Sequence, residues 1–304
     1  MDGVVLQWIV PAAMFGVMLG MGLTLGPEDF RRIALLPGPT ALGTVLQLVA
    51  MPLAGLALAR GFALEPLLAA GLVVIAACPG GVMSNVLCHL GKADTALSIT
   101  LTALATTVTL LTIPLWVRAS VAGMVDAGPS VEMPLLETAL DLGAFTVLPV
   151  ALGMVVRPWW PALAAREAWL TRASTAAIIV ALTIEALRSE DPPVAALAAS
   201  WTPSLVLLAI AFALGVGVPL ALGLAWRDAA TIAVELCIKN SVLGLFVATE
   251  SLGSLDAAVP TAVFMTFQMP AALGALALYH LAERRRLQER ARSSSSTSTR
   301  TRTS

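Results

Sequence analysis

Two side chains of opposite charge stand in the middle of an apolar stretch, residues 228–252. Glu235 and Lys239 lie four residues apart there, and Asn240 follows directly. In a bilayer each such charge costs about 2.5–3.5 kcal/mol on the insertion scale. Charges persist at that depth where they face a polar centre that binds ions or substrate, or where they form a buried ion pair. On an intact helix the four-residue spacing places carboxylate and ammonium on one face. The pair therefore indicates either a transport site or an internal ion pair.

A second interruption falls within the apolar stretch 64–90, where Pro79, Gly80 and Gly81 follow one another. Proline removes a backbone donor and clashes with the preceding turn, and paired glycines relax the chain. In lipid, such a break is tolerated where it is buried in protein or lines a cavity. Interrupted or polar segments at matching places in two halves of a chain are typical of the central site of a transporter.

Oxygen-bearing side chains accompany the break. Ser84 and Asn85 follow the glycines, Ser98 and Thr102 lie one helical turn apart on the next apolar stretch, and Gln47 is central in an earlier one. Each has an ordinary role available, because membrane Ser and Thr bond to their own helix and Gln joins helices. Together with one carboxylate, these hydroxyl and amide oxygens form a hard-oxygen set that suits an alkali cation.

The elements that must position these residues are membrane-spanning helices. The chain has 304 residues, of which 58% are hydrophobic and 12% charged, and its mean hydropathy is +0.87. Soluble globular proteins carry about 25% charged residues. The apolar blocks nearly all reach the roughly 20 residues that cross a bilayer core. We therefore expect an all-α polytopic membrane protein of about nine spans, near residues 4–25, 38–59, 64–90, 94–117, 134–156, 169–187, 202–225, 228–252 and 256–281.

Orientation follows from the distribution of Lys and Arg between alternate loops. Loops after odd-numbered spans are rich in them and loops after even-numbered spans are poor. The first set is Arg31, Arg32, Lys92, Arg157, Arg166, Arg172 and Arg227, the second is Arg60, Arg118 and Arg188, and Arg284, Arg285 and Arg286 follow the last span. This bias predicts a cell (plasma or inner) membrane protein with an outside N-terminus and a cytoplasmic C-terminus. Residues 282–304 are an Arg/Ser/Thr tail that we expect to be disordered.

Other classes of protein are disfavoured by what the sequence lacks. Cys78, Cys88 and Cys237 all fall inside apolar stretches and have no metal-ligand spacing. There is no His-Glu-x-x-His, Gly-x-Ser-x-Gly or Walker motif. We expect no enzyme activity, no organic cofactor and no nucleic-acid partner. The expected partners are the lipid bilayer and a small solute, and the oligomeric state stays open.

Several of these segments together resemble the bile acid:sodium symporter family, over about residues 10 to 280. The segments that carry the likeness are Ala77-Cys78-Pro79-Gly80-Gly81-Val82-Met83-Ser84-Asn85, Leu97-Ser98, Thr102, Glu235, Asn240-Ser241, Met21-Gly22-Leu23-Thr24-Leu25, Asp29-Phe30, Gln47 and Met51-Pro52. The resemblance implies an NhaA-like inverted-repeat fold with two broken helices that cross at mid-membrane. It implies a panel of spans 4–25, 134–156 and 169–187, and a core of the other spans, as in nine-helix members.

The resemblance also implies two sodium sites. The first consists of Ser84, Asn85, Ser98, Thr102 and Glu235. The second consists of Gln47, Glu235, the carbonyls of Leu236 and Ile238, and a family glutamine at position 239, where this chain has Lys239. A protonated ammonium supplies the same single positive charge and can donate to the same oxygens, including that of Gln47. We therefore predict that Lys239 replaces the second sodium, which leaves one coupled sodium or none.

The substrate implied by the resemblance is a small organic anion beside the helix crossing. Its expected contacts are Gly81, Val82, Asn240 and Gln268, where Val82 and the Gln268-Met269 pair depart from the family pattern. A bile acid, a keto acid and a pantoate-like acid all stay open. Two alternatives on the same fold also stay open: a cation/proton exchanger, and a sodium-independent anion transporter.

Overall fold

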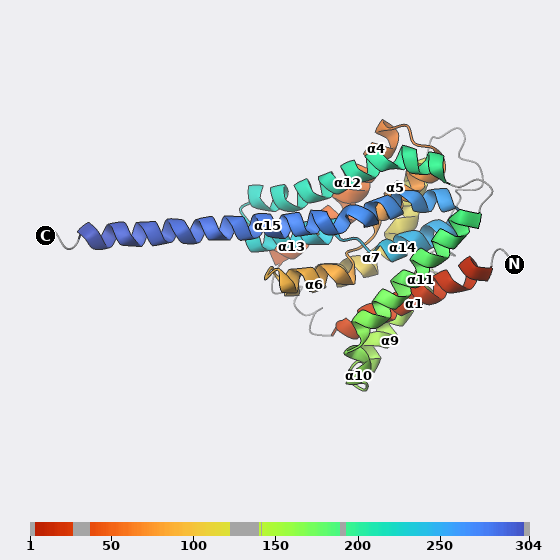
Figure 1. Cartoon of the computed structure of the whole chain (residues 1–304), viewed down its shortest axis with the longest axis horizontal. Coiled ribbons are helices and arrows are strands. Elements are labelled where there is room, and N and C mark those ends of the chain that lie inside the picture. The colour runs from red at the N-terminus through yellow and green to blue at the C-terminus, as the bar shows by residue number, and fades with distance from the viewer. Residues whose placement is uncertain (1–3, 27–36, 122–139, 141, 189–192, 301–304) are drawn as a thin grey trace.

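The computed structural model describes residues 4–26, 37–121, 140, 142–188 and 193–300. These residues form a bundle of helices without a named strand, and the helix at the C-terminal end extends away from it (Figure 1). The label α marks an α-helix and η a π-helical segment, and each kind is numbered along the chain. The elements are α1 (Val4–Thr24), α3 (Pro37–Val45), η2 (Leu46–Ala50), α4 (Met51–Gly61), α5 (Pro66–Ala77), α6 (Val82–Leu90), α7 (Thr95–Val121), η4 (Gly143–Val147), α9 (Leu148–Val156), α10 (Pro161–Ala164), α11 (Glu167–Arg188), α12 (Val194–Ala221), α13 (Trp226–Cys237), α14 (Ser241–Phe246), η5 (Val247–Ser251) and α15 (Leu255–Arg300).

Within the described residues, four helices are long and apolar enough to cross a membrane. They are Pro37–Gly61, Glu167–Arg188, Val194–Ala221 and Leu255–Glu289. A fifth is added if α7, bent by 63° between its parts Thr95–Thr109 and Leu111–Val121, counts as one span. The expected spans 64–90 and 228–252 are each divided into two shorter helices, and part of 134–156 lies outside the described residues. The chain is thus a multi-pass helical membrane protein.

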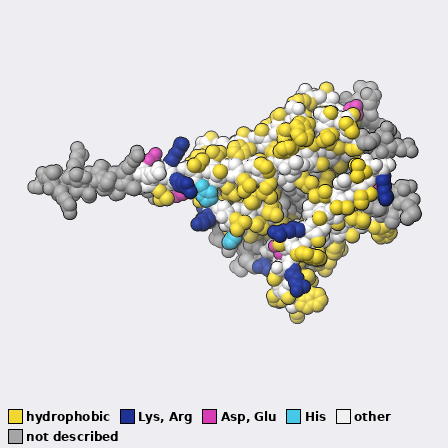
Figure 2. Space-filling view, viewed as in Figure 1, with side chains coloured by type: hydrophobic (Ala, Val, Ile, Leu, Met, Phe, Trp, Pro, Cys, Tyr) yellow, Lys and Arg dark blue, Asp and Glu magenta, His cyan; other side chains and the backbone are white. Residues whose placement is uncertain are grey.

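The surface of the bundle agrees with a location in the membrane. Large apolar side chains of α7, α9 and α11 point outward, among them Leu111, Val155 and Leu187. Figure 2 shows hydrophobic side chains over much of the visible face, with several Lys and Arg side chains gathered where α15 leaves the bundle. An apolar surface of this extent is stable against lipid and would not be stable against water.

The helices pack into two groups. In the first, α1 packs against α9 and α11, and a Cβ on Gly22 would overlap the backbone of Val150. In the second, α12 packs on α13 and α15, and α5 on α4, α7 and α15. A Cβ on Gly215 would likewise overlap Ala233. Small residues allow helix backbones to approach closely in a membrane, so each group is tightly packed. Contacts between the groups are fewer, and α14 against α1 is one of them.

The C-terminal tail differs from the expectation of disorder, because α15 continues to Arg300. Residues 282–292 are mainly Ala, Leu, Glu, Gln and Arg, which are strong helix formers, and the stretch has no Gly or Pro to end the helix.

Candidate functional site

Two broken helices cross at the centre of the second group. The first consists of α5 and α6, separated by residues 78–81, where Pro79, Gly80 and Gly81 lie; the second consists of α13 and α14, separated by residues 238–240. The two breaks pair in antiparallel fashion: Gly81 N donates to Ile238 O at 3.0 Å and Asn240 N to Pro79 O at 2.8 Å. This pairing satisfies backbone groups that the breaks remove from their helices, as burial in lipid requires.

The crossing also brings four helix ends together. The C-terminal ends of α5 and α13 and the N-terminal ends of α6 and α14 all meet at the paired breaks. Helix C-terminal ends carry partial negative charge and N-terminal ends partial positive charge. The centre of the fold therefore offers places for both a cation and an anion.

Three hydroxyl groups surround the carboxylate of Glu235, which is completely buried on α13. Ser84 Oγ of α6 donates to Oε1 at 2.5 Å, and Ser98 Oγ of α7 forms a short contact with the same oxygen. Thr102 Oγ1, also on α7, lies 3.0 Å from Oε1 and 2.9 Å from Oε2. Gly80 packs against this carboxylate so closely that a Cβ there would overlap Oε2.

The cluster around Glu235 contains more hydrogen-bond acceptors than hydroxyl hydrogens. Ser98 Oγ lies 2.8 Å from Asn85 Oδ1 as well as beside Glu235, and Ser84 Oγ lies 2.7 Å from Gly81 O as well as beside Glu235. Each hydroxyl has a single hydrogen, so neither can donate to both of its acceptors. A buried set rich in acceptors, with one carboxylate among them, has the chemistry of a site for a small hard cation.

A contact that the sequence did not reveal sets the register of the two helices that carry this cluster. Asp94 N donates to Thr231 Oγ1 at 2.8 Å, and Asp94 Oδ1 accepts 3.0 Å bonds from two N–H groups in the first turn of α7. Asp94 precedes Ser98 by four positions, and Thr231 precedes Glu235 by four. The Asp94–Thr231 contact therefore lies one helical turn from the contact between Ser98 and Glu235. Arg227 Nη2 lies 3.8 Å from Asp94 Oδ2. The Asp directly before the helical stretch that begins at Thr95 was the available capping signal.

Lys239 is 2% exposed, and its ammonium donates to Cys78 O at 3.0 Å. That carbonyl lies at the C-terminal end of α5. The expected hydrogen bond to Gln47 was wrong: Gln47 is fully buried on η2, and its Oε1 and Nε2 have no partner. In the part of the chain that the structure describes, no carboxylate lies within 4.0 Å of the ammonium, so Glu235 and Lys239 do not form a direct ion pair. The partial charge at the helix end takes the place of a carboxylate partner.

The residues predicted for the substrate also lie at the crossing, but two of them have structural partners. Asn240 caps α14, where its Oδ1 accepts from Leu243 N at 3.1 Å, and Gln268 Oε1 of α15 accepts from Lys239 N at 3.1 Å. Gly81 precedes α6, and Val82 is the first residue of that helix. The backbone of the break thus uses side chains that the sequence indicated only as substrate contacts.

Comparisons with known proteins agree on one family. The profile of the "Sodium Bile acid symporter family" matches residues 11–189. A probable chloroplastic sodium/metabolite cotransporter of Oryza sativa subsp. japonica is 29% identical over 261 residues, which are 84% of this chain and 63% of the relative. The chain therefore spans less than two thirds of that protein.

Two further relatives have similar names. An uncharacterized sodium-dependent transporter, YocS, of Bacillus subtilis (strain 168) is 29% identical over 251 residues, 82% of this chain and 75% of the relative. The ileal sodium/bile acid cotransporter of Homo sapiens is 27% identical over 240 residues, 79% of this chain and 68% of the relative.

Proposed function

Since this chain belongs to the sodium bile acid symporter family, we propose that it is a secondary active transporter that moves small organic anions together with sodium. One observation carries the proposal: a fully buried carboxylate, Glu235, collects three hydroxyl groups beside the crossing of two broken helices. Relatives named as sodium/metabolite and sodium/bile acid cotransporters support the same activity.

The proposed architecture is an NhaA-like fold of about nine spans, in which each broken helix crosses the membrane once. The group of α1, α9 and α11 would form the panel, and the group that contains the crossing would form the core. The N-terminus would lie outside and the C-terminus in the cytoplasm, as the distribution of Lys and Arg indicates. The sparse contacts between the two groups support movement of one against the other during transport.

Sodium would bind where the oxygens of Ser84, Asn85, Ser98, Thr102 and Glu235 converge. Entry of the ion would turn the hydroxyl hydrogens away from the centre and point their lone pairs at the cation. Because each hydroxyl already faces more acceptors than it has hydrogens, this exchange removes competition between acceptors. The ion's charge would be balanced by Glu235.

The second sodium of the family would be replaced by Lys239. Its ammonium lies at the C-terminal end of α5, where partial negative charge favours a cation. Leu236 and Gln47 would remain from the former site without coordinating an ion. The expected coupling is one sodium per substrate. A sodium-independent transporter is one alternative, and the fixed positive charge of Lys239 favours it. A cation/proton exchanger is the other, and the buried carboxylate of Glu235 favours it.

The substrate's anionic group would bind at the N-terminal end of α6, near Gly81, Val82 and Asn240, with Gln268 holding the backbone of the break in place. Helix N-terminal ends attract anions through their free N–H groups and dipole. Val82 adds no hydroxyl donor, so the sequence near the glycines does not select among organic acids.

The test uses purified protein. A thermal-shift screen of small organic acids with and without sodium finds ligands, because binding to the folded state raises its melting temperature. Uptake of the best labelled acid into proteoliposomes under a sodium gradient then measures transport.

Glu235→Gln, which keeps the shape but removes the charge, should abolish sodium-driven uptake while leaving expression near normal. The matched control is Glu185→Gln on α11, which should transport like the wild type. Sodium-driven uptake that survives Glu235→Gln would refute the site, and failure of every organic acid to bind or move would refute the function.

A further inference from the structure

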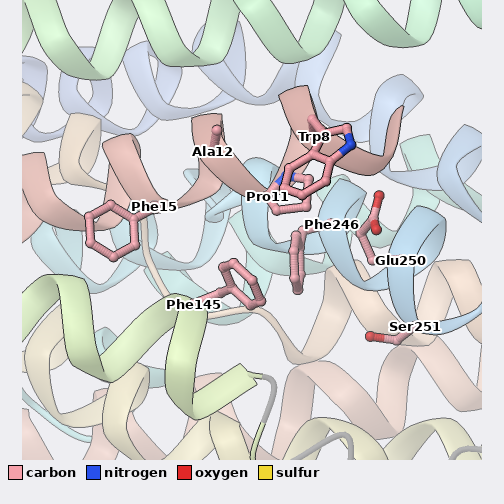
Figure 3. Close-up of a pocket in the computed structure, with 8 residues that line it drawn as sticks. All are labelled: Trp8, Pro11, Ala12, Phe15, Phe145, Phe246, Glu250 and Ser251. Carbon is pink, nitrogen blue, oxygen red and sulfur yellow. The ribbon is translucent and has the colours of Figure 1, made fainter. Parts of the chain in front are cut away.

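A cavity of about 650 Å³ lies between the two groups of helices, with α1 and η4 on one side and the α14–η5 segment on the other (Figure 3). Its walls include four aromatic rings and two polar side chains, from Trp8, Phe15, Phe145, Phe246, Glu250 and Ser251. The rings of Phe145 and Phe246 are in contact, with centroids 5.2 Å apart, so the two groups meet within it. None of the site residues predicted from the sequence lines this cavity.

Two helical segments that line the cavity also reach the helix crossing. On α1, Trp8 and Phe15 line it, and Met18, about one turn further along, contacts Asn240 with Sδ 4.0 Å from Nδ2. On the opposite side, Glu250 and Phe246 line it, and the same Asn240 begins the helix that carries them. Both walls of the cavity therefore belong to segments that continue to Asn240, at the proposed anion-binding end of the crossing. Phe246 and Glu250 lie about 9 and 15 Å from Asn240 along the helix, at 1.5 Å per residue.

The charge in this cavity does not suit an anion. Among the described residues that line it, Glu250 is the one charged residue, and no Lys or Arg is present. In Figure 3 the Glu250 carboxylate lies on the same side of the cavity as the rings of Trp8 and Phe246, and Phe15 lies at the opposite side. Aromatic faces attract cations, and quaternary ammonium groups bind where several rings and a carboxylate surround them. A neutral apolar group would leave the carboxylate unused, and an anionic one would be repelled.

We infer that this cavity binds a positively charged group at the far end of the transported acid, so that the substrate class is zwitterionic. The inference rests on the proposed function, because the acid's carboxylate is the group that binds at the crossing. One molecule would then span the distance from the crossing to Glu250, with an apolar body against the phenylalanine rings. The ordinary role for Glu250 is solvation at the membrane surface, which predicts no preference for a cationic ligand.

The test compares two ligands that differ in one atom type. One is a linear acid ending in a trimethylammonium group and the other is the same acid ending in tert-butyl, with roughly eight to twelve carbons to match the span of about 9–15 Å. Affinity is measured by thermal shift and by inhibition of uptake. The wild type should bind the trimethylammonium acid about tenfold tighter, as one carboxylate and several ring faces imply. Glu250→Gln should reduce that ratio to about twofold, the share left to the rings.

Glu185→Gln on α11, whose carboxylate lies outside the cavity, is the matched control and should leave the ratio unchanged. Because the ratio is taken within each variant, a partial loss of folded protein does not alter it. Equal binding of both acids by the wild type, or a preference that survives Glu250→Gln, overturns the inference and leaves the proposed function standing. If neither acid binds and no other organic acid does, both are wrong.

Discussion

Lys239→Gln is the substitution that tests most directly how this chain differs from its relatives. It removes the buried positive charge and returns an amide oxygen to position 239. The Gln side chain is one bond shorter than that of Lys, so the present 3.0 Å bond from the ammonium to the carbonyl of Cys78 would be lengthened or lost. The amide oxygens of positions 239 and 47 and the carbonyl of Ile238 would then form the uncharged oxygen set that the family resemblance implies for a second sodium.

The size of the effect follows from the charges. A sodium ion that shared these oxygens with the ammonium would lie about 4 Å from it, and two unit charges at that distance repel by about 4 kcal/mol at an effective dielectric constant of about 20. Since each 1.4 kcal/mol is tenfold in affinity, the ammonium weakens a second sodium site by about a thousandfold. Removing it should bring that site within reach of millimolar sodium.

The assay is sodium-dependent uptake in proteoliposomes, with the Hill coefficient for sodium as the readout. It should be near one for the wild type and rise toward two for Lys239→Gln. Lys239→Met is the matched control, because it removes the charge without adding an oxygen ligand. Its Hill coefficient should stay near one, so that the comparison separates loss of repulsion from gain of a ligand.

The reasoning fails if Lys239→Gln transports with an unchanged Hill coefficient and an unchanged dependence on sodium. A wild-type Hill coefficient of two would also refute it, since the ammonium and a second sodium would then coexist. Transport by the wild type without any sodium would instead favour the sodium-independent alternative.

Two other predictions concern the cluster and the topology. Gly80→Ala should weaken sodium binding at least tenfold, because its Cβ would displace the Glu235 carboxylate. The control is Gly217→Ala, where a Cβ has open space, and it should bind sodium like the wild type. Equal sodium affinities of the two variants would show that the carboxylate has room to move. Membrane-impermeant labelling should reach Gly3→Cys, outside the described residues, from the exterior and Arg286→Cys from the cytoplasm, and labelling of both from one side would exclude an odd number of spans.

Composition and hydropathy were enough to predict a multi-pass helical membrane protein, because lipid permits few other solutions for apolar blocks of this length. Local chemistry was also informative. Pro79 and the glycines after it interrupt a helix through their own backbone geometry, without help from distant residues. Helix α5 does end at Ala77, just before them. The continuation of α15 past the last expected span follows from residues 282–292, whose Ala, Leu, Glu, Gln and Arg are strong helix formers.

The partners of the polar residues were decided by tertiary structure. Ser84 and Thr102 meet Glu235 across 151 and 133 residues of sequence, and no local pattern specifies such a pairing. The same holds for Lys239, whose four-residue spacing from Glu235 suggested an ion pair. The helix breaks between them, so the side chain turns to the carbonyl of Cys78 on the other broken helix. The aromatic cavity likewise depends on how α1 and α14 approach each other, because its walls come from three separate segments that become neighbours only when the two groups of helices pack.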